Sequence, residues 1–225
     1  MKTKGFSKII ALGALGFIFA VLTGGVAGGK PARNPESDPI RIACMGDSIT
    51  YGLGIEDPVK NSYPANLGRL LGKKYSVINY GVSGVTVLKN GNFPIWREAA
   101  LAAALVSSPD IVIIMLGTND SKPNNWKYRS EFVADYMDLI RGFTRLESQP
   151  RVWLCTPMPV YLDRWGISDD VIKYEIMPLI DQVVLRTGAK VIDVYAAFSG
   201  KPELFPDKIH PDEAGAQMLA ETIYS

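Results

Sequence analysis

The chain has 225 residues, of which 47% are hydrophobic and 21% are charged, and its formal net charge is +1. A chain of this length and composition can bury one substantial core, so we expect a single globular domain. The near-neutral charge, without a run of Lys or Arg, lacks the basic surface on which nucleic-acid binding depends. We therefore expect a small molecule or a glycan as partner.

The N-terminus has the pattern of an export signal. Lysines among the first eight residues precede 14 apolar residues at positions 9–22, and the small residues Gly25 and Ala27 then occupy the −3 and −1 positions of a cleavage site. An uncleaved membrane anchor is less favoured, because about 20 residues are needed to span a bilayer. We predict a signal peptide over residues 1–27 and a proline-punctuated linker over 28–39. The protein is expected to be exported, to the periplasm or beyond, without stable membrane insertion after signal removal.

From residue 40 to residue 225 the sequence alternates between strand and helix patterns. Apolar, β-branched runs predict strands at Ile40–Met45, Ser76–Tyr80, Ile111–Leu116, Arg151–Cys155 and Lys190–Val194. Helical patterns follow at Tyr63–Leu71, Ile95–Ser107, Ser130–Glu147, Val171–Thr187 and Asp212–Tyr224. Strand cores such as "IVIIML" are apolar on both faces, which is typical of a parallel sheet covered by helices on both sides. The sequence predicts an α/β fold, a three-layer α/β/α sandwich around a five-stranded parallel sheet.

Polar residues follow the predicted strands, where parallel sheets bind their ligands. The first strand is followed by "GDS", the second by "NYGVSG", the third by "GTND" and the fourth by "TPMP". Before the last helix, "FPDKIHPDEAG" contains His210, the only histidine of the chain, three residues after Asp207. The turn before Pro211 would allow the acid to orient the imidazole.

These motifs resemble those of the SGNH (GDSL-type) hydrolase superfamily, and in particular bacterial carbohydrate O-acetylesterases. In family order, the matching positions are Ser48 in "GDS", Gly84 in "NYGVSG", Asn119 in "GTND", and Asp207 with His210 in "DKIHPD". Ile49 departs from the family's name-giving motif, which has Leu there. The expected strand order is 2-1-3-4-5. The resemblance also implies an oxyanion hole formed by the backbone N–H groups of Ser48 and Gly84 and the side-chain amide of Asn119.

The same residues suit the chemistry of an ester hydrolase. A serine hydroxyl needs an adjacent base to act as a nucleophile, and histidine is the side chain that titrates near neutrality. Asp207 would hold the tautomer of His210 and stabilise the imidazolium that forms. We therefore predict a catalytic triad of Ser48, His210 and Asp207 that works through an acyl-enzyme.

The remaining polar and sulfur-containing residues near the strand ends are interpreted as structural. Asp47 and Asp120 are expected to bond local backbone in turns. Cys44 and Cys155 would lie on strands separated by one other strand, about 10 Å apart, which is beyond disulfide reach. One histidine and two separated cysteines do not make a zinc cluster, so neither a metal nor another cofactor is expected.

The loops after the third and fourth strands predict the substrate class. They contain Trp126, Tyr161 and Trp165 among hydrogen-bonding side chains, a mixture that favours a sugar ring over a long acyl chain. Each aromatic residue could equally cover the core. The predicted function is a secreted serine esterase that removes acetyl groups from a carbohydrate. A lipase, lysophospholipase or thioesterase would use the same triad, and acyl transfer stays open; a non-catalytic glycan-binding module is less favoured because it needs no triad.

Overall fold

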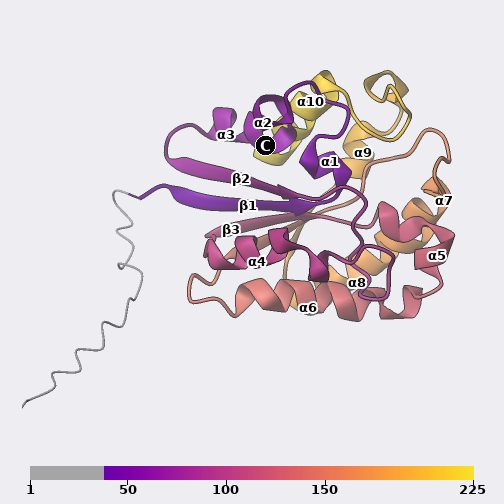
Figure 1. The fold of residues 1–225 in the computed structure, drawn as a ribbon, viewed down its shortest axis with the longest axis horizontal. Helices are drawn as coiled ribbons and strands as arrows, with labels where there is room; N and C mark the ends of the chain where they lie inside the picture. Colours follow the sequence, from indigo (N-terminus) through magenta and orange to yellow (C-terminus); the bar gives the residue numbers. More distant parts are fainter. Residues whose placement is uncertain (1–37) are drawn as a thin grey trace, which may run out of the picture. The chain divides into compact units, whose positions relative to one another are not determined.

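The computed structural model describes residues 38–225 (Figure 1), so the predicted signal peptide and most of the predicted linker lie outside the described residues. The strands of the described chain are β1 (Ile40–Gly46), β2 (Tyr75–Gly81), β3 (Ile111–Met115), β4 (Arg151–Cys155) and β5 (Lys190–Ile192). They form one five-stranded sheet in the order β2-β1-β3-β4-β5, and every pairing is parallel. Both the predicted α/β fold and the predicted strand order are confirmed.

Helices cover both faces of this sheet, as Figure 1 shows. The α-helices are α1 (Ser48–Tyr51), α2 (Pro58–Asn61), α3 (Tyr63–Leu71), α4 (Ala99–Val106), α5 (Pro123–Trp126), α6 (Phe132–Thr144), α7 (Asp169–Val171), α8 (Met177–Thr187), α9 (Val194–Phe198) and α10 (Glu213–Tyr224). Short 3-10 turns lie at Ile95–Arg97, Asn119–Ser121, Arg129–Glu131 and Pro202–Leu204, and a π-helical segment at Ile172–Ile176 joins α7 to α8. No helix of the described chain is both long enough and apolar enough to cross a membrane.

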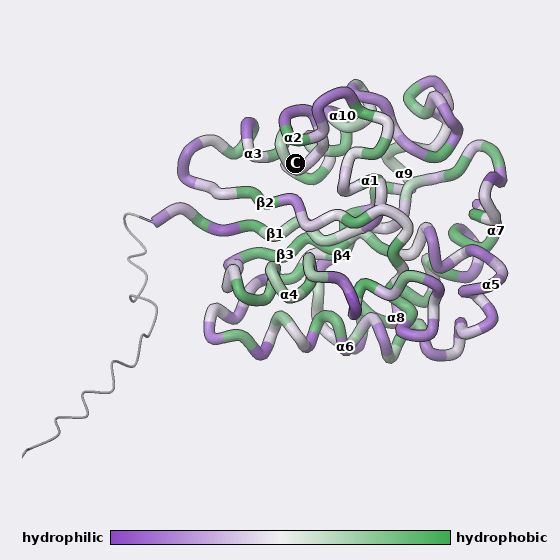
Figure 2. The backbone as a smooth tube through the Cα atoms, viewed as in Figure 1, coloured by the Kyte–Doolittle hydropathy of each residue, from purple (hydrophilic) through white to green (hydrophobic). Residues whose placement is uncertain are grey.

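Alternate residues of the central strands enter two separate cores. Met45 of β1 and Ile114 of β3 pack with α4, α6 and α8, whereas Cys44 and Ile113 pack with α3, α9 and α10. Figure 2 shows the corresponding hydropathy: hydrophobic residues gather along the central strands, and hydrophilic residues along the outer turns. Burial on both faces is why these strands read as continuous apolar runs in the sequence.

Two predicted elements differ from the structure at their ends. The predicted helix Ile95–Ser107 is wrong in its first part, because Glu98 has an extended backbone (φ −89°, ψ 136°) that separates the 3-10 turn from α4. The predicted strand Lys190–Val194 ends at Ile192, because Asp193 begins α9 by accepting a hydrogen bond from the N–H of Ala196. A capping side chain next to an apolar run therefore ended the strand earlier than its hydropathy suggests.

The cysteines are free thiols, as predicted. Cys44 and Cys155 are both buried and unbridged, and both belong to the core on the α3 and α10 side of the sheet. Burial raises the pKa of Cys44 to about 12. Such thiols stay protonated and act as small apolar side chains.

The strand register brings the polar strand ends to one edge of the sheet. Gly46 at the end of β1 lies opposite Gly81 of β2 and Met115 of β3. A Cβ on Gly46 would meet the Thr50 hydroxyl at 2.0 Å and the Met115 carbonyl at 2.8 Å, so glycine is what allows α1 to fold back over the end of the strand. The residues after β1, β2 and β3 are therefore neighbours in space.

Candidate active site

Ser48 is held at the end of β1 by the start of α1. Asp47 caps this helix, since its Oδ1 accepts a hydrogen bond from the N–H of Ile49 at 3.0 Å. Burial raises the pKa of Asp47, against the opposing effects of that N–H and of the nearby His210. Ser48 follows as the first residue of the helix and is only 6% exposed. Asp47 thus has the turn-stabilising role predicted for it.

Ser48, His210 and Asp207 form one chain of hydrogen bonds. The Ser48 Oγ lies 2.9 Å from His210 Nε2, and His210 Nδ1 lies 2.7 Å from Asp207 Oδ2. The other oxygen of Asp207, Oδ1, accepts hydrogen bonds from the backbone N–H groups of Ile209 (2.9 Å) and His210 (2.7 Å). Partial burial acts to raise the pKa of Asp207, but the hydrogen bonds from His210 and from both N–H groups outweigh it and lower the pKa. Asp207 is therefore an ionised acceptor for the imidazole.

The turn that carries His210 is fixed at both of its ends. Before it, the Lys208 carbonyl accepts a hydrogen bond from the N–H of Tyr161 at 2.9 Å. After it, Asp212 caps α10 by accepting from the N–H of Gly215, and its own N–H donates to the Leu204 carbonyl. The imidazole itself is buried, at 6% exposure.

A cavity of about 240 Å³ opens in front of Ser48. Ser48, Gly84, Asn119 and His210 line it, so the structure brings the proposed oxyanion donors and the base to one place. Gly84 has a left-handed backbone (φ +84°), and a Cβ there would meet no atom within 4 Å, so the need for glycine comes from the backbone conformation. Asn119 is 3% exposed, and its side-chain amide lies 3.5 Å from Asp47 Oδ2.

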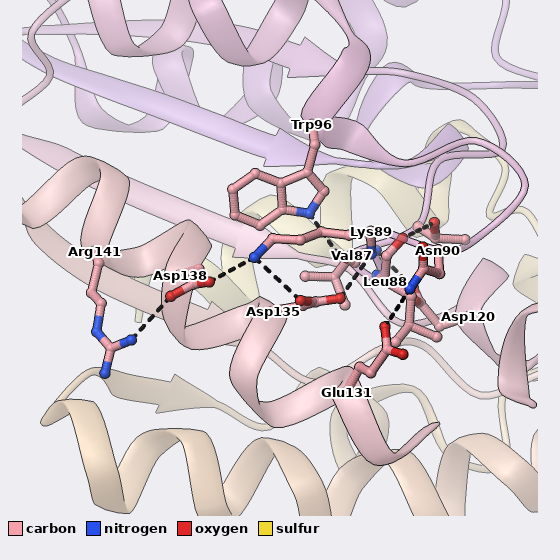
Figure 3. Close-up of polar contacts among 11 residues, drawn as sticks. Val87, Leu88, Lys89, Asn90, Trp96, Asp120, Glu131, Asp135, Asp138 and Arg141 are labelled. Carbon is pink, nitrogen blue, oxygen red and sulfur yellow. Dashed lines mark hydrogen bonds and ion pairs between the residues drawn. The ribbon is translucent and has the colours of Figure 1, made fainter. Parts of the chain in front are cut away.

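The loop that carries Gly84, residues 82–98, is anchored by buried carboxylates (Figure 3). Asp120 accepts hydrogen bonds from the N–H groups of Val87 (3.1 Å) and Leu88 (2.9 Å), and it is fully buried. Burial raises its pKa to about 7, although both N–H groups act to lower it. Asp135 of α6 accepts from the N–H of Lys89 at 2.8 Å. Asp120 is therefore structural, as predicted, but it bonds the backbone of the 82–98 loop, more than 30 residues away, and not the local turn that was expected.

Of the predicted aromatic contacts, the structure brings only Trp165 to this cavity. Trp165 is 56% exposed, and its ring centre lies 6.0 Å from that of His210. Trp126 is 5% exposed and donates its indole N–H to Glu175 at 2.8 Å. Tyr161 donates its hydroxyl hydrogen to the Phe198 carbonyl and accepts from the N–H of Lys201. Trp126 and Tyr161 therefore bond other parts of the protein, and neither lines the Ser48 cavity.

The cavity wall also contains Lys122, one of the hydrogen-bonding side chains expected among the loop aromatics, and three residues that were not predicted to line it: Leu53, Ser83 and Ile167. Ser83 stands next to Gly84, so the motif could have pointed to it. Leu53 and Ile167 reach the cavity only through tertiary folding and leave no local signal. Among residues 38–225, no three His, Cys, Asp or Glu side chains are grouped so as to hold a metal ion.

A family model and two known proteins match most of this sequence. The model of the GDSL-like lipase/acylhydrolase family matches residues 44–218. An acetylxylan esterase from Xylanibacter ruminicola is 41% identical over 212 residues, which cover 86% of this chain and 44% of the relative. A multidomain esterase from Ruminococcus flavefaciens is 25% identical over 85% of this chain and 29% of its own length. The chain thus spans less than half the length of these relatives.

Solved structures show the same fold at lower sequence identity. A carbohydrate acetylesterase from Sinorhizobium meliloti has a TM-score of 0.67 at 22% identity, with 81% of this chain and 95% of that chain covered. A catalytic mutant of an acetylxylan esterase from Geobacillus stearothermophilus has a TM-score of 0.62 at 23% identity, with 83% and 93% covered. At these identities the likeness establishes the fold.

Proposed function

Because the chain belongs to the GDSL-like lipase/acylhydrolase family, we propose that it is a serine esterase that removes acetyl groups from a carbohydrate. The observation that carries this proposal is the hydrogen-bonded chain from Ser48 through His210 to Asp207, at the wall of a cavity that also receives Gly84 and Asn119. A nucleophile, a base and oxyanion donors serve no purpose together in a protein that only binds its ligand.

His210 acts first as base and then as acid. Its Nε2 accepts the proton of Ser48 while the Ser48 Oγ attacks the ester carbonyl, and Asp207 on Nδ1 stabilises the imidazolium. The same proton then passes from Nε2 to the departing sugar hydroxyl, which leaves an acetyl-serine. Water, deprotonated by His210, attacks this intermediate and releases acetate.

The negative oxygen of the tetrahedral intermediate is stabilised by the backbone N–H groups of Ser48 and Gly84 and by the Asn119 amide. Within residues 38–225, neither backbone N–H donates a hydrogen bond to a protein acceptor, so both are available to a ligand. Donors that are already fixed before reaction stabilise the developing charge without reorganisation. Gly84 owes its fixed position to the anchored 82–98 loop.

Four further observations support an acetyl group as the acyl group and a carbohydrate as its carrier. The Ser48 cavity, at about 240 Å³, is small for a long acyl chain, and the exposed Trp165 ring at its wall suits the face of a sugar. The relative that is 41% identical is an acetylxylan esterase. The N-terminal export pattern supports action outside the cytoplasm, where large glycans are found.

A chain-length series tests the acyl preference. The wild type should hydrolyse p-nitrophenyl acetate and lose activity sharply on esters beyond about four carbons, because the cavity limits the acyl group. Product analysis on acetylated oligosaccharides should show free acetate and no acetyl transfer to other sugars. A maximum at octanoate or longer would favour the lipase alternative, and an absence of ester hydrolysis would contradict the proposal.

A further inference from the structure

A second cavity adjoins the Ser48 cavity and has a volume of about 610 Å³. It is lined by Ser121, Pro123, Trp126, Lys127, Arg129, Asp163, Gly166, Ile167, Ser168 and Val171. Ile167 lines both cavities, and Gly166 packs beside the Lys122 stem, since a Cβ on Gly166 would lie 3.8 Å from the Lys122 Cγ. We call the two cavities together the groove. Its lining comes mainly from α5 and its flanking residues and from the 161–168 loop.

The groove is lined by more positive than negative charge. Lys122 lines the Ser48 cavity, Lys127 and Arg129 line the second cavity, and Asp163 is the acidic residue of the lining. Among the described residues none of these three cations forms an ion pair, and Asp163 already accepts a hydrogen bond from the N–H of Asp169 at 3.2 Å. Within the described residues, the groove therefore presents cations that are not ion-paired with a carboxylate.

Lys122 is the most informative of these cations because it is half-buried beside the nucleophile. Burial lowers its pKa below the ordinary value, and the charge of Asp47 acts in the opposite direction. By contrast, Lys89 on the far side of the 82–98 loop pairs with Asp135 at 3.3 Å and Asp138 at 2.6 Å. A half-buried ammonium group without a carboxylate gains most from a ligand that supplies one.

We propose that the glycan bound in the groove carries carboxylates, as a uronic-acid-bearing polysaccharide does. One carboxylate, close to the acetylated sugar, pairs with Lys122, and further carboxylates along the chain meet Lys127 and Arg129. Trp165 covers a sugar face at the junction. This substrate class deepens the proposed esterase function and rests on it.

The test compares two fractions of one acetylated xylan, one neutral and one bearing glucuronic acid side chains, separated by anion exchange. The wild-type kcat/KM should be about tenfold higher on the acidic fraction, since a charge-assisted hydrogen bond distinguishes the two. Lys122→Met, which keeps the apolar stem, should reduce this preference to less than about threefold, mainly through KM. Adding Lys127→Met and Arg129→Met should reduce the preference for the acidic fraction further when the oligosaccharides are longer.

Lys73→Met serves as the matched control, because Lys73 is exposed at the opposite edge of the sheet, before β2. It should leave the preference unchanged. Equal wild-type kcat/KM on both fractions, with p-nitrophenyl acetate hydrolysed normally, would overturn this inference alone. Lys122→Met slowing both fractions and p-nitrophenyl acetate alike would also overturn it, because Lys122 would then act on the reacting carbonyl. Failure of the wild type on every ester would remove the esterase function itself.

Discussion

Two loops face each other across the Ser48 cavity, and they are held in different ways. The 82–98 loop contributes Ser83 and Gly84, and the 161–168 loop contributes Trp165 and Ile167. In the first loop, backbone N–H groups donate to the carboxylates of Asp120 and Asp135, and Val87, Leu88 and Ile95 are fully buried.

In the 161–168 loop, residues 162–166 are exposed, and the backbone is left-handed at Trp165 (φ +54°) and Gly166 (φ +79°). The loop is tied at its two ends: Tyr161 bonds Phe198 and Lys201, and beyond the exposed residues the Ser168 N–H donates to the Ser121 hydroxyl at 3.1 Å and the Asp169 N–H to Asp163. The 82–98 loop, the first wall of the site, is therefore fixed from the core, and in the proposed mechanism this is the wall whose donors meet the oxyanion without reorganisation. The other wall is built at the surface, where substrates are distinguished.

The largest effect on activity should come from substituting Ser48, which lines the cavity together with both loops. Ser48→Ala should lower kcat by about 10⁴- to 10⁶-fold, because the triad fails as a unit when its nucleophile is removed. The melting temperature should stay close to that of the wild type. An organophosphonate should label only the peptide that contains Ser48, as mass spectrometry can show. An adduct on Ser83 or Ser121 would contradict the assignment of Ser48 as the nucleophile.

A second substitution removes the carboxylate that anchors the 82–98 loop. Asp120→Ala leaves the buried N–H groups of Val87 and Leu88 without an acceptor and should lower the free energy of unfolding by about 2 to 4 kcal/mol. It should also reduce kcat by about tenfold, because Gly84 loses its fixed position. Urea unfolding and kinetics measure both. Asp163→Ala in the other loop is the matched control and should shift the melting temperature by no more than about 1 °C. If the two substitutions lowered stability and kcat equally, the proposed difference between the two loops would be contradicted.

The contribution of Asp120, the anchor of the 82–98 loop, to stability should also depend on pH. The folded state raises the pKa of Asp120 from 3.8 to about 7 through burial, so its contribution to stability is fully present below pH 3.8 and is lost as pH rises through about 7. Asp120→Asn cannot titrate and serves as the reference. The free energy of unfolding of the wild type minus that of Asp120→Asn should decrease as the pH rises from 3.8 to about 7, and should stay constant at higher pH. Urea titrations at a series of pH values give this difference. A difference that rises with pH would reverse the sign and refute the assignment.

The smallest effect on activity should come from substituting Trp165 in the exposed part of the 161–168 loop. Trp165→Ala removes the sugar-facing ring and should raise KM for acetylated oligosaccharides by about threefold to tenfold, with kcat little changed. The melting temperature should not move, because the side chain is 56% exposed. Trp126→Phe makes the comparison sharper: this tryptophan is buried against Phe132, so its substitution should lower stability. Loss of stability in Trp165→Ala would show that the loop is part of the core.

The sequence predicts the anchored part of the site better than the exposed part. Ser48 and Asn119 follow apolar strands directly, so a local pattern and the rule for parallel sheets place them together. Asp207 and His210 share one turn. The side chains of Trp126 and Trp165 look alike in the sequence, yet one is buried and the other exposed, because tertiary packing of α5 and α6 decides it. Ile167 enters the cavity for the same non-local reason.

Ser48 and His210 are 162 positions apart in the chain, although their side chains are hydrogen-bonded. During synthesis the proposed nucleophile is therefore made long before its proposed base. A chain that stops before Asp207 therefore has Ser48, Gly84 and Asn119, but lacks both the proposed base and the carboxylate that orients it. If Ser48 and His210 act as proposed, ester hydrolysis requires that the turn of residues 207–210 has docked against the end of β1, so enzymatic activity would report this long-range contact.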